Sequence, residues 1–150
     1  MVSEAIGSLR DEEPFEGAIG LLVSYYDKSE DSSIRRIIRE FLNDLKDQSV
    51  RVEVVAEIRK KWKPNTLSML VASCWQSGLD YSDYSTEIAK LFLKSDYMTA
   101  LECFTVIEES VHHISHAKKN EIVKIAMEGF PSPSEVKASL VQELISILSR

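Results

Sequence analysis

The residues best suited to hold a metal ion lie between positions 109 and 116. Glu109, His112, His113 and His116 are mostly three or four residues apart, so one face of an uninterrupted helix would present several of them together. Zn²⁺ accepts both imidazole and carboxylate ligands. However, Ser115 is typical of the start of a new helix, and histidines near a helix C-terminus are favoured by the helix dipole without a metal. We therefore expect no metal or cofactor, and keep a metal-dependent enzyme that uses Glu109, His112 and His116 as an alternative.

Other catalytic patterns are missing from the sequence. It contains no glycine-rich phosphate loop, no His-Glu-x-x-His motif and no nucleophile elbow. Glu108 and Glu109 are adjacent, so on a helix their side chains diverge by about 100° rather than converge on a substrate. Cys74 and Cys103 lie in apolar stretches, which is typical of buried, reduced thiols. We expect a protein that is not an enzyme.

A basic segment lies in the middle of an acidic chain. The formal net charge is −6 at pH 7, yet residues 35–63 carry 9 basic and 5 acidic side chains. An acidic protein lacks the broad basic face that nucleic acid requires, so we expect no nucleic-acid binding. The basic segment suits an acidic protein partner, with an aromatic anchor. The candidate contact residues are Arg36, Arg39, Lys60, Lys61, Trp62 and Lys63. Alternatively, these residues have a structural role, because cations stabilise the last turn of a helix and Trp62 continues the apolar stripe of the helix that precedes it.

Two tyrosines complete the candidate contact residues. Tyr81 and Tyr84 lie in a polar segment beside Asp80 and Asp83. Tyrosine is common at protein interfaces, because its ring is apolar and its hydroxyl is polar. The same residue type also packs at the ends of secondary-structure elements.

The elements that position these residues begin with a pattern that occurs twice, sixteen residues apart. Asp31-Ser32-Ser33-Ile34-Arg35 and Asp47-Gln48-Ser49-Val50-Arg51 each place Asp and Ser before a branched apolar residue. Side chains of this kind accept hydrogen bonds from the free N–H groups of a first helical turn. The pattern predicts two helices, at residues 31–45 and 47–62, and Pro64 ends the second.

Apolar periodicity predicts about eight helices and no strand over the chain. The other expected helices cover residues 14–26, 64–79, 88–93, 96–114, 115–128 and 134–150, and a short helical turn or two is expected at residues 3–10. Their links are short, which favours antiparallel neighbours in either a stack of helical hairpins or a compact bundle. We expect residues 1–150 to form one all-α domain.

The segment Asp47-x-x-Val50-Arg51-x-x-Val54-Val55-x-x-Ile58 resembles the second helix of a HEAT repeat. Asp31-x-x-Ile34-Arg35-x-x-Ile38 repeats the first half of that pattern, and the resemblance covers residues 31–62. It implies a HEAT- or armadillo-like right-handed solenoid, in which Arg35 and Arg51 brace the stack. The sequence departs from the family in two ways. Arg39 replaces an apolar residue, and the interval of sixteen residues is one helix rather than a hairpin of about 40 residues.

These observations favour a protein–protein interaction module or adaptor. An alternative is an inhibitor of the immunity type that masks a basic partner, since the chain is acidic. We expect no membrane association and a cytoplasmic location, because the N-terminal residues lack a secretory pattern and no apolar run approaches about 18 residues. The partner is another protein.

Overall fold

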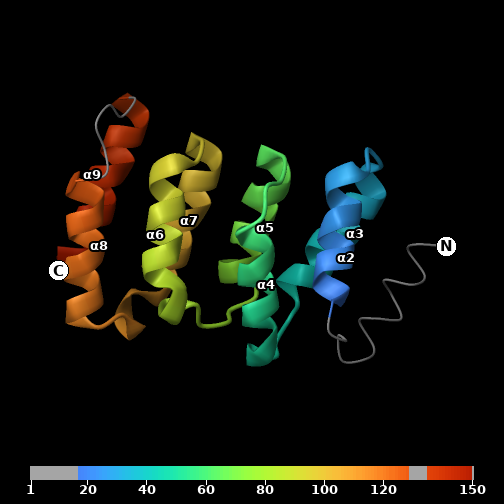
Figure 1. The fold of residues 1–150 in the computed structure, drawn as a ribbon, viewed down its shortest axis with the longest axis horizontal. Coiled ribbons are helices and arrows are strands. Elements are labelled where there is room, and N and C mark those ends of the chain that lie inside the picture. Colours follow the sequence, from blue (N-terminus) through green and yellow to red (C-terminus); the bar gives the residue numbers. More distant parts are fainter. Residues whose placement is uncertain (1–16, 129–134, 150) are drawn as a thin grey trace. The chain divides into compact units, whose positions relative to one another are not determined.

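The computed structural model describes residues 17–128 and 135–149, and within them the chain is helical (Figure 1). Eight α-helices and three short 3-10 helices occur in these ranges, with no strand, so the all-α prediction is confirmed. The helix expected at residues 3–10 and the start of the one expected from Pro14 lie outside the described residues. No helix of the described ranges is long and apolar enough to cross a bilayer.

The chain divides into two compact units, Met1–Leu79 and Asp80–Arg150. The single-domain organisation stays a prediction. The helices of the first unit are α2 (Ala18–Lys28), α3 (Ser32–Asn43), η1 (Gln48–Val50), α4 (Arg51–Ile58) and α5 (Pro64–Gln76). Those of the second are η2 (Ser82–Tyr84), α6 (Ser85–Lys94), α7 (Tyr97–Ser110), η3 (Val111–His113), α8 (His116–Glu128) and α9 (Glu135–Ser149).

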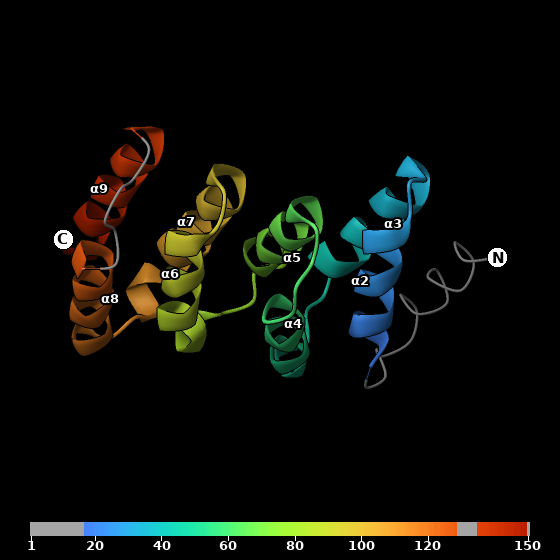
Figure 2. The same cartoon turned by 45° about the horizontal axis from the view of Figure 1, so that its top comes forward.

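The first unit consists of two helical hairpins side by side. α2 pairs with α3 and α4 pairs with α5, while α2 also packs on α4 and α3 on α5 (Figure 2). Buried aliphatic and aromatic side chains of all four helices fill the space between the hairpins; the largest fully buried ones are Ile19, Val23, Ile38, Leu42, Val54 and Leu70. Their burial supplies the main stabilisation of the unit.

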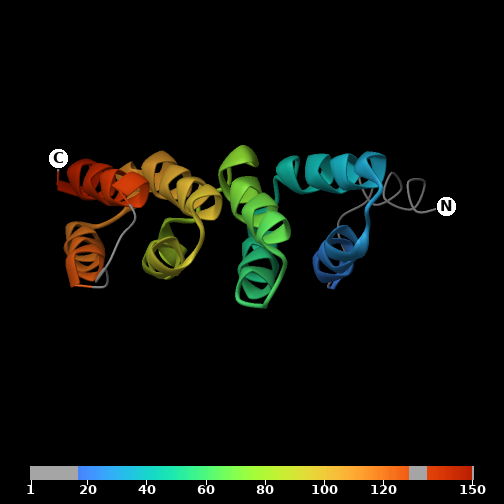
Figure 3. The same cartoon turned by 90° about the horizontal axis from the view of Figure 1, so that it is seen from above.

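The second unit repeats this plan. α6 pairs with α7 and α8 with α9, and α6 packs on α8 while α7 packs on α9 (Figure 3). Fully buried Phe92, Ile88, Ile107, Ile122 and Leu144 form its core. Each unit is therefore a pair of stacked helical hairpins.

The repeated Asp pattern starts helices in the way the sequence predicts. The Asp31 carboxylate accepts hydrogen bonds from the backbone N–H groups of Ser33 at 2.9 Å and Ile34 at 3.4 Å, which caps α3. The Asp47 carboxylate accepts from Ser49 N at 2.9 Å and opens η1, which continues directly into α4. The Arg35 guanidinium lies 5.1 Å from the centre of the Tyr26 ring and so ties α3 to α2.

The helix that follows Asp47 is shorter than the sequence predicts. α4 ends at Ile58, and Trp62 lies outside it. The Trp62 indole N–H donates to the Glu57 carbonyl at 2.7 Å. This side chain therefore supplies the hydrogen bond that a backbone N–H would supply if the helix continued. The expectation that Trp62 completes the apolar stripe of this helix is therefore wrong. The α5 boundaries agree with the prediction: Pro64 occupies its first turn and Gly78, at φ 76°, follows its end.

Lysines tie neighbouring helices together at their C-terminal ends. Lys63 Nζ donates to the Asp27 carbonyl at 2.8 Å in the last turn of α2, and Lys46 Nζ donates to the Ser77 carbonyl at 2.7 Å just after α5. In the second unit, Lys137 of α9 donates to the carbonyls of Leu93 and Ser95 at the end of α6. Each ammonium satisfies carbonyls that the helix itself leaves free and opposes the negative end of its dipole.

Candidate functional site

The histidine region does not form one continuous helix. η3 ends at His113, and Ile114 is extended, with φ −90° and ψ 127°. Ser115 Oγ then accepts from Lys118 N at 3.2 Å and α8 begins at His116, as the sequence predicts for Ser115. This break places His112 and His116 on different helices, and Glu109, His112 and His116 are all exposed. Over the described ranges, no group of three or more His, Cys, Asp or Glu side chains is arranged to hold a metal ion.

The basic candidates come from two elements of the first unit. Arg36 and Arg39 are exposed on α3. Lys60, Lys61 and Lys63 are exposed in the link between α4 and α5, where Trp62 is half-buried. Lys60 and Lys63 of this link lie along α2, since Lys63 contacts Asp27 and Lys60 is bonded to Glu57 beside Gly20.

The two candidate tyrosines contact each other. The ring centres of Tyr81 and Tyr84 lie 6.2 Å apart, with the rings tilted by 50°. Tyr81 is only 2% exposed and belongs to the core, whereas Tyr84 is half-buried. Most of the Tyr81 surface is therefore already used for packing.

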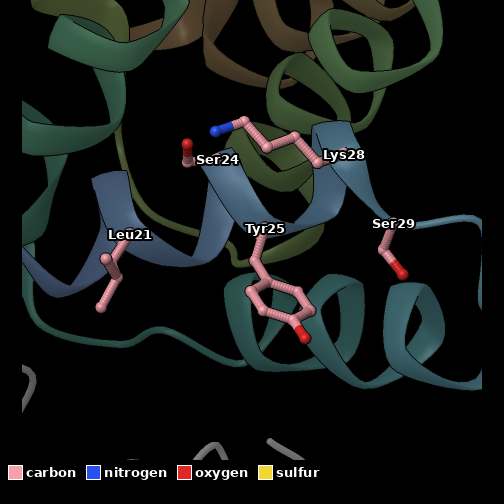
Figure 4. Close-up of a pocket in the computed structure, with 5 residues that line it drawn as sticks. All are labelled: Leu21, Ser24, Tyr25, Lys28 and Ser29. Atoms are coloured by element: carbon pink, nitrogen blue, oxygen red, sulfur yellow. The ribbon is translucent and has the colours of Figure 1, made fainter.

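An exposed apolar surface on α2 was not predicted from the sequence. Leu21 and Tyr25 lie one turn apart on α2 and are 68% and 44% exposed. They line a hollow of about 400 Å³ together with Ser24, Lys28 and Ser29. Figure 4 shows Leu21, Tyr25 and Ser29 projecting to one side of α2, and Ser24 and Lys28 to the other. We call these five residues the α2 surface.

The α2 surface arises because the helix carries two apolar stripes. Leu21-Leu22 and Tyr25-Tyr26 are doubled pairs, and adjacent residues on a helix point about 100° apart. Leu22 and Tyr26 face the core, at 6% and 5% exposure, so Leu21 and Tyr25 are left outside. These two pairs of adjacent apolar residues, four positions apart, are the sequence signal that could have revealed this surface.

A close contact between α2 and α4 runs beside the α2 surface. A Cβ atom at Gly20 would lie 3.1 Å from the Glu57 carboxylate, so a larger residue here would require this side chain to shift. Glu57 is 7% exposed, and both of its carboxylate oxygens accept from Lys60 Nζ, at 2.8 and 3.0 Å. In addition, the Glu53 carboxylate accepts from Gly17 N at 2.8 Å, at the start of α2.

Asp27 connects the end of α2 to the start of α5. Its carboxylate accepts from Lys63 N at 3.0 Å. Desolvation acts to raise the pKa of Asp27, but the neighbouring Thr66 hydroxyl, the Lys63 amide and the charges of Lys63 and Arg35 together hold this pKa below the ordinary value of 3.8. Asp27 is thus an ionised structural group at physiological pH.

Charged side chains of both signs lie beside the α2 surface. Lys28 lines the hollow, Lys63 contacts Asp27 at the end of α2, and Lys60 is paired with Glu57. The Glu53 carboxylate lies at Gly17, and Glu30 and Asp31 directly follow Ser29. The site therefore combines an apolar ridge and a hollow with a border of mixed charge, which suits contact with another macromolecule.

Comparison with known proteins found no matching family model, no matching curated protein and no matching solved structure.

Proposed function

We propose that this chain is a protein–protein interaction module and that the α2 surface is its contact surface. The observation that carries the proposal is the exposure of Leu21 and Tyr25 beside a hollow. Two large apolar side chains one turn apart can both contact the same partner, and aromatic residues next to a pocket are typical anchors of interfaces. Among residues 17–128 and 135–149, no observation of comparable weight supports catalysis.

The proposal includes a HEAT- or armadillo-like stack of hairpins, with a compact bundle as the alternative. The packing within each unit supports this proposal. The first helices of neighbouring hairpins pack together, and so do their second helices: α2 on α4 and α3 on α5 in the first unit, and α6 on α8 and α7 on α9 in the second. Contacts of Lys46, Lys63 and Lys137 with carbonyls of neighbouring helices hold the hairpins in register. A scaffold of this kind presents an exposed helix face at little conformational cost on binding.

The proposal extends to a cytoplasmic location, which is consistent with the buried, reduced thiols of Cys74 and Cys103. Arg36 and Arg39 remain candidates for a second contact, because they are exposed on α3. An inhibitor of the immunity type that masks a basic partner remains the alternative, because the chain is acidic.

The test is affinity purification of the full-length chain from its native cells. Wild type is compared with a Leu21→Ser/Tyr25→Ser variant and with Met127→Ser, a control of similar exposure at 69% in the second unit. We expect a protein that co-purifies with wild type and the control but is lost with the double variant. Equal recovery by all three chains would rule out the α2 surface as the contact.

A further inference from the structure

We infer that the α2 surface binds a second copy of this chain, with the two α2 helices antiparallel across a two-fold axis. This inference rests on the proposed function, because it identifies the partner of the same contact surface. Its support is the position of the exposed apolar residues along α2 and the position of charges of opposite sign at the two ends of that helix.

The exposed apolar residues lie symmetrically about the middle of α2. The helix runs from Ala18 to Lys28, so its central residue is Val23. Leu21 and Tyr25 are each two positions from this centre, on opposite sides of it. In an antiparallel pair centred on Val23, Leu21 of one copy therefore lies opposite Tyr25 of the other, and the contact occurs twice. Each apolar side chain is covered by one of the other copy, so the surface is complementary to itself in this arrangement.

Lys28 lies on the side of α2 that faces α4. Gly20, Ser24 and Lys28 follow one another at intervals of four residues, so they form one row along the helix. Gly20 adjoins the Glu57 carboxylate of α4, and Figure 4 shows Ser24 and Lys28 projecting to the same side of α2. The two-fold axis is perpendicular to the plane of the two antiparallel helices, so this row stays on the same side of the pair in both copies.

Charges of opposite sign mark the two ends of this row. At the N-terminal end, the Glu53 carboxylate accepts from Gly17 N at 2.8 Å, and at the C-terminal end Lys28 lines the hollow. In the antiparallel pair, Lys28 of one copy reaches the level of Ala18 of the other, beside the Glu53 carboxylate of that copy. Two contacts between opposite charges result, one at each end of the interface. The same order places each helix N-terminus beside the C-terminus of the other copy, which the helix dipoles favour.

The other charged residues beside the surface do not oppose this pairing. Two pairs of opposite charge lie together within each copy, namely Lys60 with Glu57 and Lys63 with Asp27. The Asp31 carboxylate caps α3, and Glu30 lies past the last residue of α2, outside the paired helices. The two Lys28 side chains lie ten residues apart along the pair, which is about 15 Å and exceeds the Debye length of about 8 Å at physiological ionic strength.

Analytical ultracentrifugation of the full-length chain tests the inference. Because a single helix surface gives a small interface, we expect a weak dimer with a Kd on the order of 10 μM. Leu21→Ser/Tyr25→Ser should raise this Kd by about tenfold or more. Met127→Ser, the control of similar exposure in the second unit, should change it less than about twofold.

A charge swap tests the antiparallel order of the two helices. Lys28→Glu and Glu53→Lys should each weaken the dimer by about tenfold, because both contacts then join like charges. An equimolar mixture of the two variants restores opposite charges in both contacts and should dimerise nearly as tightly as wild type. Lys124→Glu, an exposed site on α8, should change the Kd less than about twofold. Where Glu53→Lys does not fold, Glu53→Gln keeps an acceptor for the Gly17 N–H and should weaken the dimer by about threefold.

The possible outcomes separate the occupants of the surface. A chain that is monomeric up to about 300 μM would overturn the inference and leave the α2 surface to a different protein. A chain that dimerises only after removal of residues 1–16 would assign the surface to that segment and overturn it as well. A dimer that Leu21→Ser/Tyr25→Ser leaves intact, or a mixture of charge variants that stays dissociated, would refute the antiparallel α2 pair. The proposed function itself fails only if this double variant also retains every protein that co-purifies with wild type.

Discussion

Leu21 and Leu22 are adjacent on α2, and the structure predicts opposite roles for them. Leu21 is 68% exposed and Leu22 is 6% exposed. Complete burial of a leucine side chain stabilises a protein by about 1.5–3 kcal/mol, so the third of Leu21 that is covered contributes roughly 0.5–1 kcal/mol. Leu22→Ala also leaves a cavity and should cost about 2–5 kcal/mol. The same substitution at Leu21 should cost less than about 1 kcal/mol, and binding rather than stability should suffer.

Urea unfolding of the full-length chain, followed by far-UV circular dichroism, measures both changes. With a slope of about 2 kcal/mol per molar urea, Leu22→Ala should lower the midpoint of the first unit by roughly 1 M or more, and Leu21→Ala by less than about 0.5 M. The protein that co-purifies with wild type should also co-purify with Leu22→Ala, while this variant is folded, and should be recovered poorly with Leu21→Ala. Equal losses of stability at the two positions would show that Leu21 is covered in the folded chain, and the reasoning about α2 would be wrong.

Three further predictions concern the contacts that hold the scaffold. Because the pKa of Asp27 is lowered by folding, its ionised form stabilises the first unit above pH 3.8, and this contribution is lost as the pH falls through the folded-state pKa. Acid titration of the unfolding free energy should therefore be shallower in Asp27→Asn than in wild type, and identical curves would contradict the assignment. Lys137→Met removes the donor to the Leu93 and Ser95 carbonyls and should destabilise the second unit by about 1–3 kcal/mol, as measured by urea unfolding. Lys124→Met, a substitution at an exposed lysine, is the control. An equal loss of stability in the two variants would refute the contact. Equimolar Zn²⁺ should leave the melting temperatures of wild type and His112→Ala/His116→Ala alike, and a rise confined to wild type would reveal a metal site.

The parts of the fold that follow from local chemistry could be predicted from the sequence. Asp31, Asp96 and Ser115 begin helices as expected, because a side chain and an N–H group two or three residues later suffice to form a cap. Gly78 ends α5 for an equally local reason, since glycine adopts positive φ without strain.

The candidate site could not be predicted in the same way, because it depends on which arc of α2 the other helices cover. Leu21-Leu22 and Tyr25-Tyr26 offer two apolar stripes, and only the packing of α3 and α4 decides that Leu22 and Tyr26 are buried. The contact of Lys63 with Asp27 joins residues 36 positions apart, so no sequence window contains it. Trp62 shows a different limit, since its indole contact with the Glu57 carbonyl, five residues earlier, replaces the helical turn that apolar periodicity predicts.

The most direct measurement of the central claim is photo-crosslinking from position 21 in living cells. A benzophenone amino acid replaces Leu21 in one chain and Met127 in another, two sites of almost equal exposure at 68% and 69%. The account predicts a discrete crosslinked protein from position 21 and none of the same mass from position 127. Absence of a crosslink from position 21, or the same products from both positions, would contradict a specific contact surface on α2.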